Sequence, residues 1–444
     1  MDPSIFALMV VSGLIFLIFT GFPVVVALGL CSFLGIAHLM QDYDIAGALL
    51  ASSAYGAIRS YVFATIPLFV LLGEIISRSG AATDLYRVID TAMRRLPGRL
   101  ALATVGGNTV FGAVTGVSIA SAATFSRIAY PEMVRAHYNK SVALGSIAGS
   151  AALGMLIPPS ILLIIWGVVA SESIGRLFVA GIVPGILLAS MFFVFLLTLA
   201  LIKPKLFGED SQSVLDKSKA AIDNPITAKM LFGCFLVIAL IMVILGGIWT
   251  GFFTPTEAGG VGVLFAVLVG LIKGMRVKEF VQSVLNTGRI SAPLLFLLIT
   301  AEMYSRMLAQ GGIIDVVAGL FFGLAGDVTM ILIIMVMVWL LLGMFLDSVS
   351  IILLTVPLFA PIAAQAGMDP LAFAIIGIVA IEAGLLTPPF GMCVYTVKGA
   401  VSDPDVTLAK IFTGAIPYWL ILLALVGLIM TIPEIASWLP GKLL

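Results

Sequence analysis

Asp347 is the acidic residue in this sequence that is hardest to explain as part of a surface. No other Asp or Glu occurs between Asp327 and Asp369, and the flanking residues are almost all apolar. A charge in hydrocarbon costs at least about 2.5–3.5 kcal/mol unless it finds a partner. Sodium suits this carboxylate because it prefers hard oxygen ligands, and Ser350 adds a hydroxyl one helical turn away. The pattern predicts a cation site at Asp347, and the alternative is that Asp347 only caps a helix N-terminus.

Two proline pairs interrupt apolar stretches at equivalent points of the chain. Pro158-Pro159 lies within residues 141–170, and Pro388-Pro389 lies within residues 371–398. Inside a membrane, a broken helix is tolerated only where the break faces protein or a water-filled cavity. Each break frees carbonyl groups that suit a cation and amide groups that suit an anion. We therefore expect two ion-binding broken helices, with a simple structural kink as the alternative.

The stretch before each broken helix is expected to be a re-entrant helical hairpin, which enters and leaves the membrane by the same face. These hairpins are residues 100–126 and 329–360, with polar tips at residues 115–118 and 347–350. Helix N-termini at such tips carry unpaired amides that can hold a carboxylate without a buried Arg or Lys. Arg127 lies near the end of its hairpin, not at its tip. A small organic anion is therefore expected to bind between the two tips.

The composition places these elements in a lipid bilayer. The chain has 444 residues, of which 61% are hydrophobic and 10% charged, and its mean hydropathy is +1.20. So few polar side chains cannot cover a water-facing surface. Many windows reach the roughly 20 apolar residues of a spanning helix. The expected fold class is an all-α polytopic membrane protein. Its zero formal net charge gives no reason to expect a nucleic-acid partner.

Other kinds of chemistry have little support in the sequence. Cys31, Cys234 and Cys393 lie far apart in apolar runs, so they are expected to be buried small side chains, not ligands or disulfides. His38 and His137 lie near helix ends or loops, and no spacing typical of a metal site or an activated nucleophile occurs. An intramembrane enzyme is therefore the disfavoured alternative.

Two further acidic residues lie in apolar surroundings. Glu382 falls within the second broken helix. Glu257 follows Thr254 and Pro255 at an expected helix start. Stabilisation of the first helical turn explains Glu257 at least as well as a binding role does.

The chain resembles itself at a shift of about 230 residues. Residues 154–160 match residues 384–390, including both proline pairs. The same shift pairs Gly112 with Gly343, Pro131 with Pro361, residues 181–184 with 414–417, and, more weakly, residues 66–69 with 292–295 and 21–23 with 253–255. Membrane transporters are often built from such repeats, and their substrates bind at the repeat interface.

The distribution of positive charge indicates that the two repeats are inverted. Residues 81–167 carry seven Arg and Lys residues, whereas residues 307–397 carry none. Loops rich in Arg and Lys stay cytoplasmic, so equivalent loops of the two halves are expected on opposite sides. The resulting topology puts residues 87–99 and 127–140 in the cytoplasm, residues 313–328 and 361–370 outside, and the N-terminus in the periplasm; Arg176 fits it poorly. The first helix is expected to be retained, because the chain start lacks the features of a removable signal peptide.

Short motifs in a fixed order along nearly the whole chain carry a family resemblance. They are Gly21-Phe22-Pro23-Val24, Ile66-Pro67-Leu68-Phe69 with Gly73, Gly112 with Gly116 and Ser118, Leu156-Ile157-Pro158-Pro159-Ser160, Phe178-Val179-Ala180-Gly181-Ile182-Val183-Pro184-Gly185, Phe253-Thr254-Pro255-Thr256-Glu257-Ala258, and Gly384-Leu385-Leu386-Thr387-Pro388-Pro389. Together they resemble the large membrane subunit (DctM type) of the tripartite ATP-independent periplasmic (TRAP) transporters.

The resemblance implies a sodium-driven elevator transporter with two partners. One is a small four-helix membrane subunit, expected here as a separate chain, and the other is a soluble periplasmic binding protein that delivers a carboxylate or a sulfonate. The implied parts are a first scaffold at 1–60, a first transport part at 61–202, a hydrophilic cytoplasmic linker at 203–229, a second scaffold at 230–289 and a second transport part at 290–444.

The resemblance also implies which residues bind sodium. The implied ligands are Gly116, Ser118, Pro158 and Ser160 in the first half, and Asp347, Ser350, Thr387 and Pro388 in the second. Substrate contacts are expected at Asn108, Thr115, Ser118, Ser121, Pro159, Ser348 and Pro389. Val117 stands where many relatives have a small hydroxyl residue, so the ligand set at the first tip stays open.

The predicted function is sodium-coupled uptake of a small organic anion across the bacterial inner membrane, with Na⁺ as the co-transported ion. The alternative within transport is a stand-alone dicarboxylate symporter coupled to sodium or protons. A dicarboxylate, a sialic or sugar acid, a keto acid, ectoine or a sulfonate would each suit the chemistry of the two tips.

Overall fold

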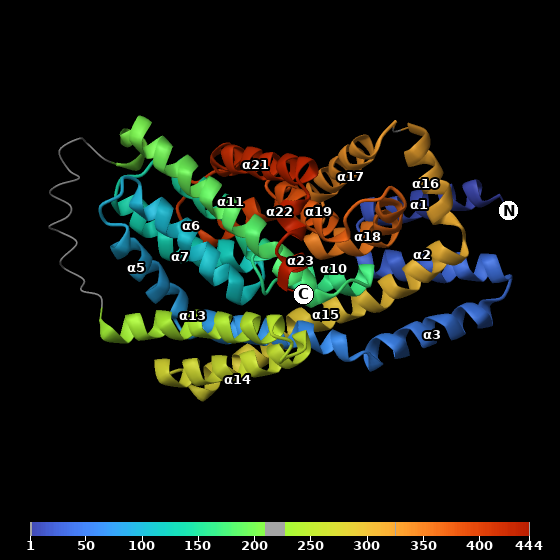
Figure 1. Ribbon diagram of the computed structural model, residues 1–444, viewed down its shortest axis with the longest axis horizontal. Coiled ribbons are helices and arrows are strands. Elements are labelled where there is room, and N and C mark those ends of the chain that lie inside the picture. The colour runs from blue at the N-terminus through green and yellow to red at the C-terminus, as the bar shows by residue number, and fades with distance from the viewer. Residues whose placement is uncertain (1, 209–226, 325, 444) are drawn as a thin grey trace.

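A computed structural model describes residues 2–208, 227–324 and 326–443 of the chain, and all regular structure in these ranges is helical (Figure 1). Seven of the described helices are long and apolar enough to cross a membrane, or nine if each of two bent pairs counts as one span. The all-α polytopic fold is thereby confirmed. Most of the predicted linker, residues 209–226, lies outside the described residues.

The first half of the chain forms a series of helices that ends in one long span. Its elements are α1 (Pro3–Phe19), α2 (Val24–Met40), α3 (Tyr43–Arg59), the 3-10 helix η1 (Tyr61–Ala64), α4 (Thr65–Arg78), α5 (Ala81–Ala92), α6 (Arg99–Thr115), α7 (Ser118–Arg135), α8 (Lys140–Ser150), α9 (Leu153–Leu156), α10 (Ile161–Ala170), α11 (Ile174–Ile202) and η2 (Pro204–Phe207).

The second half follows the same order. Its elements are α13 (Ala228–Trp249), α14 (Pro255–Lys273), α15 (Val277–Gln310), α16 (Ile313–Leu324), α17 (Val328–Gly343), α18 (Ser348–Gln365), α19 (Pro370–Gly384), α20 (Met392–Ala400), α21 (Leu408–Thr431), α22 (Glu434–Ser437) and α23 (Pro440–Leu443). One difference is that α3, η1 and α4 of the first half correspond to the single helix α15. Pro293 lies inside α15 at the position that matches Pro67.

Both expected hairpins are present, and both are longer than expected. The first comprises α6 and α7 and extends to Arg135, well past the predicted end at 126, because Pro131 is accommodated inside α7. The second comprises α17 and α18 and extends to Gln365. In Figure 1 the first hairpin approaches the middle of the molecule from the end where α5 and α13 begin, and the second approaches from the side of α16.

Both broken helices are also present, and matching side chains start them. Asn139 caps α8 by accepting from the amide of Ser141 at 2.9 Å. Asp369 caps α19 by accepting from the amides of Leu371 and Ala372 at 3.0 and 2.8 Å. Such caps satisfy amides that have no partner within the helix. The first broken helix is α8, α9 and α10, bent by 43°, and the second is α19 and α20.

Paired glycines set the contact between each hairpin and its broken helix. Gly112 of α6 lies against the backbone of Gly154 in α9, and Gly343 of α17 lies against Gly384 of α19. A methyl group at any of these positions would meet main-chain atoms. Close helix approach in membranes depends on such small residues. The sequence match between Gly112 and Gly343 therefore has a packing cause.

Three segments expected to be loops or left unassigned are helices. Residues 43–59 form α3, residues 81–92 form α5 and residues 313–324 form α16. The polar faces of α3 and α5 kept them below the apolar threshold of a spanning helix. In α5, for example, Leu85 and Tyr86 are buried while charged residues occupy the other face.

Candidate functional site

The first hairpin tip rests on the first helix break. Gly116 joins α6 to α7 with a left-handed backbone, φ +61°, and its carbonyl accepts from the amide of Ile161 at 3.3 Å. A side chain at this glycine would meet the carbonyl of Pro159 and the Cα of Ser160. The position therefore requires glycine both for its φ and for its close approach. Tip and break of the first half, as expected from the sequence, are in direct contact.

The first helix break is not accessible to solvent. Pro158, Pro159 and Ser160 are all buried. The Ser160 hydroxyl caps α10 by accepting from the amide of Leu163 at 3.4 Å, and it donates to the carbonyl of Met155. Ser160 thus satisfies backbone groups that the break releases from both half-helices.

At the second tip, Asp347 has the geometry of a helix N-cap. Its carboxylate accepts from the amides of Val349 and Ser350, each at 3.1 Å, and from the Ser350 hydroxyl at 2.5 Å. The capping alternative therefore describes what Asp347 does for α18. The carboxylate is only partly buried, and among the salt bridges of the described residues it has no cationic side chain. Its role as a sodium ligand stays a prediction.

The second break is open where the first is closed. Pro388, Pro389 and Phe390 are exposed, whereas the matching prolines of the first half are buried. Thr387 donates its hydroxyl to the carbonyl of Ala383 at 3.0 Å, which ties the break to the last turn of α19. Phe390 contacts Phe345 of the second tip loop, with ring centroids 6.0 Å apart. The two halves share a sequence pattern but differ in accessibility.

The residues expected to contact substrate lie at two depths. Thr115, Ser118 and Ser348 are at the tips, and all three are buried. Asn108 lies two turns before the first tip and donates to Ser150 of α8 at 2.7 Å. Ser121 is fully buried against Gly154. The structure therefore brings the tip residues together, but it places Asn108 and Ser121 in the packing between α6, α7 and the first broken helix.

Two residues that contact the tips were named from the sequence but were not assigned to the site. Ser348 donates to the carboxylate Oε1 of Glu382 at 2.8 Å, and Glu382 is only 2% exposed. The Cys393 thiol lies 3.8 Å from the Ser118 hydroxyl. Both tips thus contact side chains of the second broken helix. Glu382 was detectable as an acid within an apolar run, but nothing in the sequence placed it beside Ser348.

The halves also pack on each other in a crossed arrangement. Helix α7 of the first hairpin packs on α20 of the second broken helix, and α18 of the second hairpin packs on α10 of the first. In each pair, a helix that begins at a tip meets a helix that begins at a break. Of these four helix N-termini, those of α10 and α18 carry a side-chain cap, whereas those of α7 and α20 have none and keep unpaired amides.

One cavity lies away from the tips. It has a volume of about 750 Å³ and is lined by η1, the segment between α10 and α11, and the segment between α13 and α14. Glu172 and Arg176 both line it. Arg176, which fits the charge-based topology poorly, thus borders a cavity between segments from both halves.

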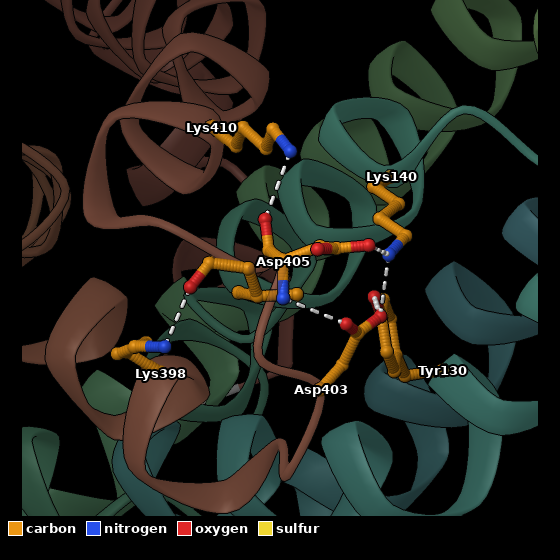
Figure 2. A network of polar contacts seen from close by, with 7 residues as sticks. Tyr130, Lys140, Lys398, Asp403, Asp405 and Lys410 are labelled. Atoms are coloured by element: carbon orange, nitrogen blue, oxygen red, sulfur yellow. Dashed lines mark hydrogen bonds and ion pairs between the residues drawn. The ribbon is translucent and has the colours of Figure 1, made fainter.

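A polar network fastens the loop between α20 and α21 to the first half (Figure 2). Lys140 contacts the carboxylates of Asp403 at 2.8 Å and Asp405 at 3.0 Å, and the Tyr130 hydroxyl donates to Asp403 at 2.7 Å. The Lys140 ammonium and the Tyr130 hydroxyl lower the pKa of Asp403 to about 2. Lys410 donates to the backbone of the same loop. The network holds two segments that are more than 260 positions apart in the chain.

Glu257 has a structural role that its sequence context suggested. Its carboxylate accepts from the amide of Thr254 at 2.8 Å, while the Thr254 hydroxyl accepts from the amide of Glu257 at 3.3 Å. This reciprocal capping box starts α14. The first-turn explanation of Glu257 is confirmed.

Known proteins with similar sequences are transport permeases. The chain is 32% identical over 396 residues to the C4-dicarboxylate TRAP transporter large permease protein DctM of Pseudomonas aeruginosa, covering 89% of this chain and 90% of that protein. It is 28% identical over 425 residues to the isethionate TRAP transporter permease protein DctMQ of Oleidesulfovibrio alaskensis, covering 95% of this chain but 64% of that protein.

The fold is similar to that of a solved transporter. The crystal structure of YdaH from Alcanivorax borkumensis superposes with a TM-score of 0.57 over 88% of this chain and 89% of that one, at 13% sequence identity. The enzyme alternative is set aside, because the relatives are permeases. The model of the "Tripartite ATP-independent periplasmic transporter, DctM component" family matches residues 11–435, and the chain therefore belongs to this family of bacterial inner-membrane permeases.

Proposed function

We propose that this permease takes up a small organic anion, a carboxylate or a sulfonate, in symport with sodium. The observation that carries the proposal is the duplicated pair of hairpin tip and helix break. In the first half Gly116 contacts the break directly, and in the second half Phe345 contacts Phe390. Two such pairs supply hydroxyls, free carbonyls and one carboxylate for cations, and helix N-termini for an anion.

The proposed sodium ligands are the tip and break residues of each half. They are Gly116, Ser118, Pro158 and Ser160 in the first half, and Asp347, Ser350, Thr387 and Pro388 in the second. Asp347 already accepts three hydrogen bonds, which leaves lone pairs on its carboxylate for an ion. The anion is proposed to bind near Ser348, Pro389 and the first tip, on the accessible side of the second break.

The proposed motion is that of an elevator. Hairpins and broken helices would move together as one body against a scaffold formed by α1 to α3 and by α13 and α14. The glycine contacts between hairpin and broken helix, and the network around Asp403, support a single moving body because they tie its parts to each other. The proposed orientation has the N-terminus in the periplasm.

The proposed partners are a periplasmic binding protein and a small four-helix membrane subunit. The chain spans only 64% of the DctMQ permease. The remaining length of that relative is what a fused small subunit would require. In this protein the small subunit is proposed to be a separate chain.

Reconstitution tests the proposal. The permease, its small subunit and its binding protein would be placed in proteoliposomes, and uptake of labelled C4-dicarboxylate and of isethionate would be measured with and without an inward sodium gradient. Uptake is expected only with the gradient. Uptake that ignores sodium would refute the coupling, and full uptake without a binding protein would favour a stand-alone symporter.

Asp347→Asn gives the sharpest variant for this assay. Asn caps a helix about as well as Asp, so α18 should keep its start while the negative charge is lost. Uptake is expected to fall by roughly tenfold or more, which corresponds to about 1.4 kcal/mol of lost ion binding. Native sodium dependence in Asp347→Asn would reduce Asp347 to a helix cap.

A further inference from the structure

Glu382 is a buried carboxylate with one oxygen left unused. Its side chain belongs to α19 and is 2% exposed. Oε1 accepts from Ser348, whereas Oε2 has no hydrogen-bond partner among the described residues. A buried ionised carboxylate is costly unless it is paired with a cation or fully hydrogen-bonded. The unused oxygen therefore has room for a proton or a cation.

The surroundings of this carboxylate come from both halves of the permease. Ser348 is the first residue of α18, and Ser118, the first residue of α7, lies near the same carboxylate. The Cys393 thiol contacts Ser118. None of the salt bridges within the described ranges involves Glu382. The nearby groups are thus hydroxyls and a thiol, with no fixed positive side chain.

Helix dipoles do not replace the missing positive charge. The N-terminus of α18 is already capped by Asp347, so its partial charge is largely matched. The N-terminus of α7 has no side-chain cap and contributes only about half an elementary charge. An ionised Glu382 would therefore keep a net negative charge. Two serine hydroxyls flank it with free lone pairs, which are the hard oxygen donors that sodium prefers.

We propose that Glu382, Ser118 and Ser348 form a sodium site shared by the two halves, in addition to the two sites proposed at the tips and breaks. This inference rests on the sodium coupling proposed above. Because its ligands come from both hairpins and from α19, the ion would hold the two tips against one broken helix. Occupation of this site would then favour the arrangement in which both tips are closed together.

The test measures sodium binding directly in the complete chain. Purified permease in lipid nanodiscs would be titrated with sodium chloride against choline chloride at constant ionic strength, and thermal stability would be recorded. Sodium is expected to stabilise the native protein, since a ligand that binds only the folded state does so. Glu382→Gln is expected to raise the half-saturating sodium concentration about tenfold or more, as expected for a ligand interaction of at least ~1.4 kcal/mol.

A matched control separates ion binding from general damage to the core. Thr355→Val removes the buried hydrogen bond from Trp339 in the same hairpin, 2.8 Å long, without touching Glu382. It should lower stability and leave the sodium titration unchanged. If Glu382→Gln does not fold, Glu382→Asp is measured instead, because withdrawing the carboxylate by one methylene should also weaken sodium binding.

The outcomes distinguish this site from the proposed function. A native protein without any response to sodium overturns both. A native response that is identical in Glu382→Gln, or in Glu382→Asp where the first variant does not fold, overturns only the shared site. An unchanged sodium response together with a lost pH dependence in Glu382→Gln would assign the carboxylate to a proton and equally overturn the sodium site.

Discussion

At the scale of single residues, Asp403 shows how one carboxylate joins distant parts of the permease. It lies in the loop between α20 and α21 and accepts from Lys140 of α8 and Tyr130 of α7 (Figure 2). Both donors stabilise its ionised form. Ionisation of this one residue therefore contributes to holding the second broken helix against the first hairpin.

The lowered pKa of Asp403 predicts an acid-sensitive contribution to stability. Its folded pKa is about 2, below the ordinary value of 3.8. A depressed carboxylate pKa stabilises the fold above the unfolded value, and that stabilisation is lost as pH falls from about 4 to 2. Asp403→Asn is therefore expected to lower the melting temperature at pH 7 and to flatten its decline between pH 4 and pH 2.

Thermal unfolding in detergent across this pH range checks the prediction. Asp315→Asn is the control, since Asp315 is exposed in the first turn of α16 and takes part in none of the ion pairs of the described residues. It should follow the native curve. An Asp403→Asn curve that coincides with the native one would show that the network adds nothing.

Residue roles were only partly readable from the sequence. Asp347 was found because it is isolated in an apolar run, yet its capping bonds to Val349 and Ser350 depend on local geometry. Ser118 and Ser348 were placed at the tips correctly. Their link through Glu382 and Cys393 joins residues 34 and 275 positions apart, which no local pattern can predict.

At the scale of elements, the contact between α17 and α19 depends on two facing glycines. A Cβ at Gly343 would lie 2.7 Å from the Cα of Gly384. Main-chain atoms cannot move out of the way of this Cβ, as the end of a flexible side chain could. The hairpin would have to separate from the broken helix that it supports.

Gly343→Ala is therefore expected to destabilise the permease by about 1–3 kcal/mol, the usual cost of overpacking. Gly319→Ala is the matched control: this glycine lies in α16 and has no atom within 4 Å of the added methyl. There alanine should be neutral or stabilise by up to about 1 kcal/mol through helix propensity. Thermal unfolding of both variants gives the comparison, and equal effects would contradict a close-packing role.

The main elements were predictable because proline pairs and glycines are strong local signals. Both hairpins and both broken helices lie where the pattern placed them, apart from their ends. Helices α3 and α5 were missed because a search for long apolar windows does not detect helices with a polar face, and α16 was missed because its 12 residues are too few for such a window. The break in α3–η1–α4 that α15 lacks also had no clear signal.

At the scale of the whole molecule, the order of helices repeats and the two hairpins approach from opposite ends (Figure 1). Arg and Lys are abundant in the loops of one half and absent from the equivalent loops of the other. Both observations are satisfied if the two repeats are inserted into the membrane in opposite orientations.

This topology predicts opposite labelling of two exposed residues. Single cysteines at Arg95, between α5 and α6, and at Gln365, at the end of α18, would be introduced after replacement of the three native cysteines. A membrane-impermeant thiol reagent that reaches the permease only from the periplasm is expected to label Gln365→Cys and not to label Arg95→Cys. Labelling of both from one side would exclude the inverted arrangement.

The unequal exposure of the two proline breaks has a consequence for the transport cycle. The two repeats need not adopt the same conformation, and here the proline break of the first repeat is buried while that of the second is exposed. Exchanging those shapes between the copies would produce a second conformer that opens toward the opposite face of the bilayer. In the elevator cycle proposed above, the present conformer would then serve as a template for its counterpart.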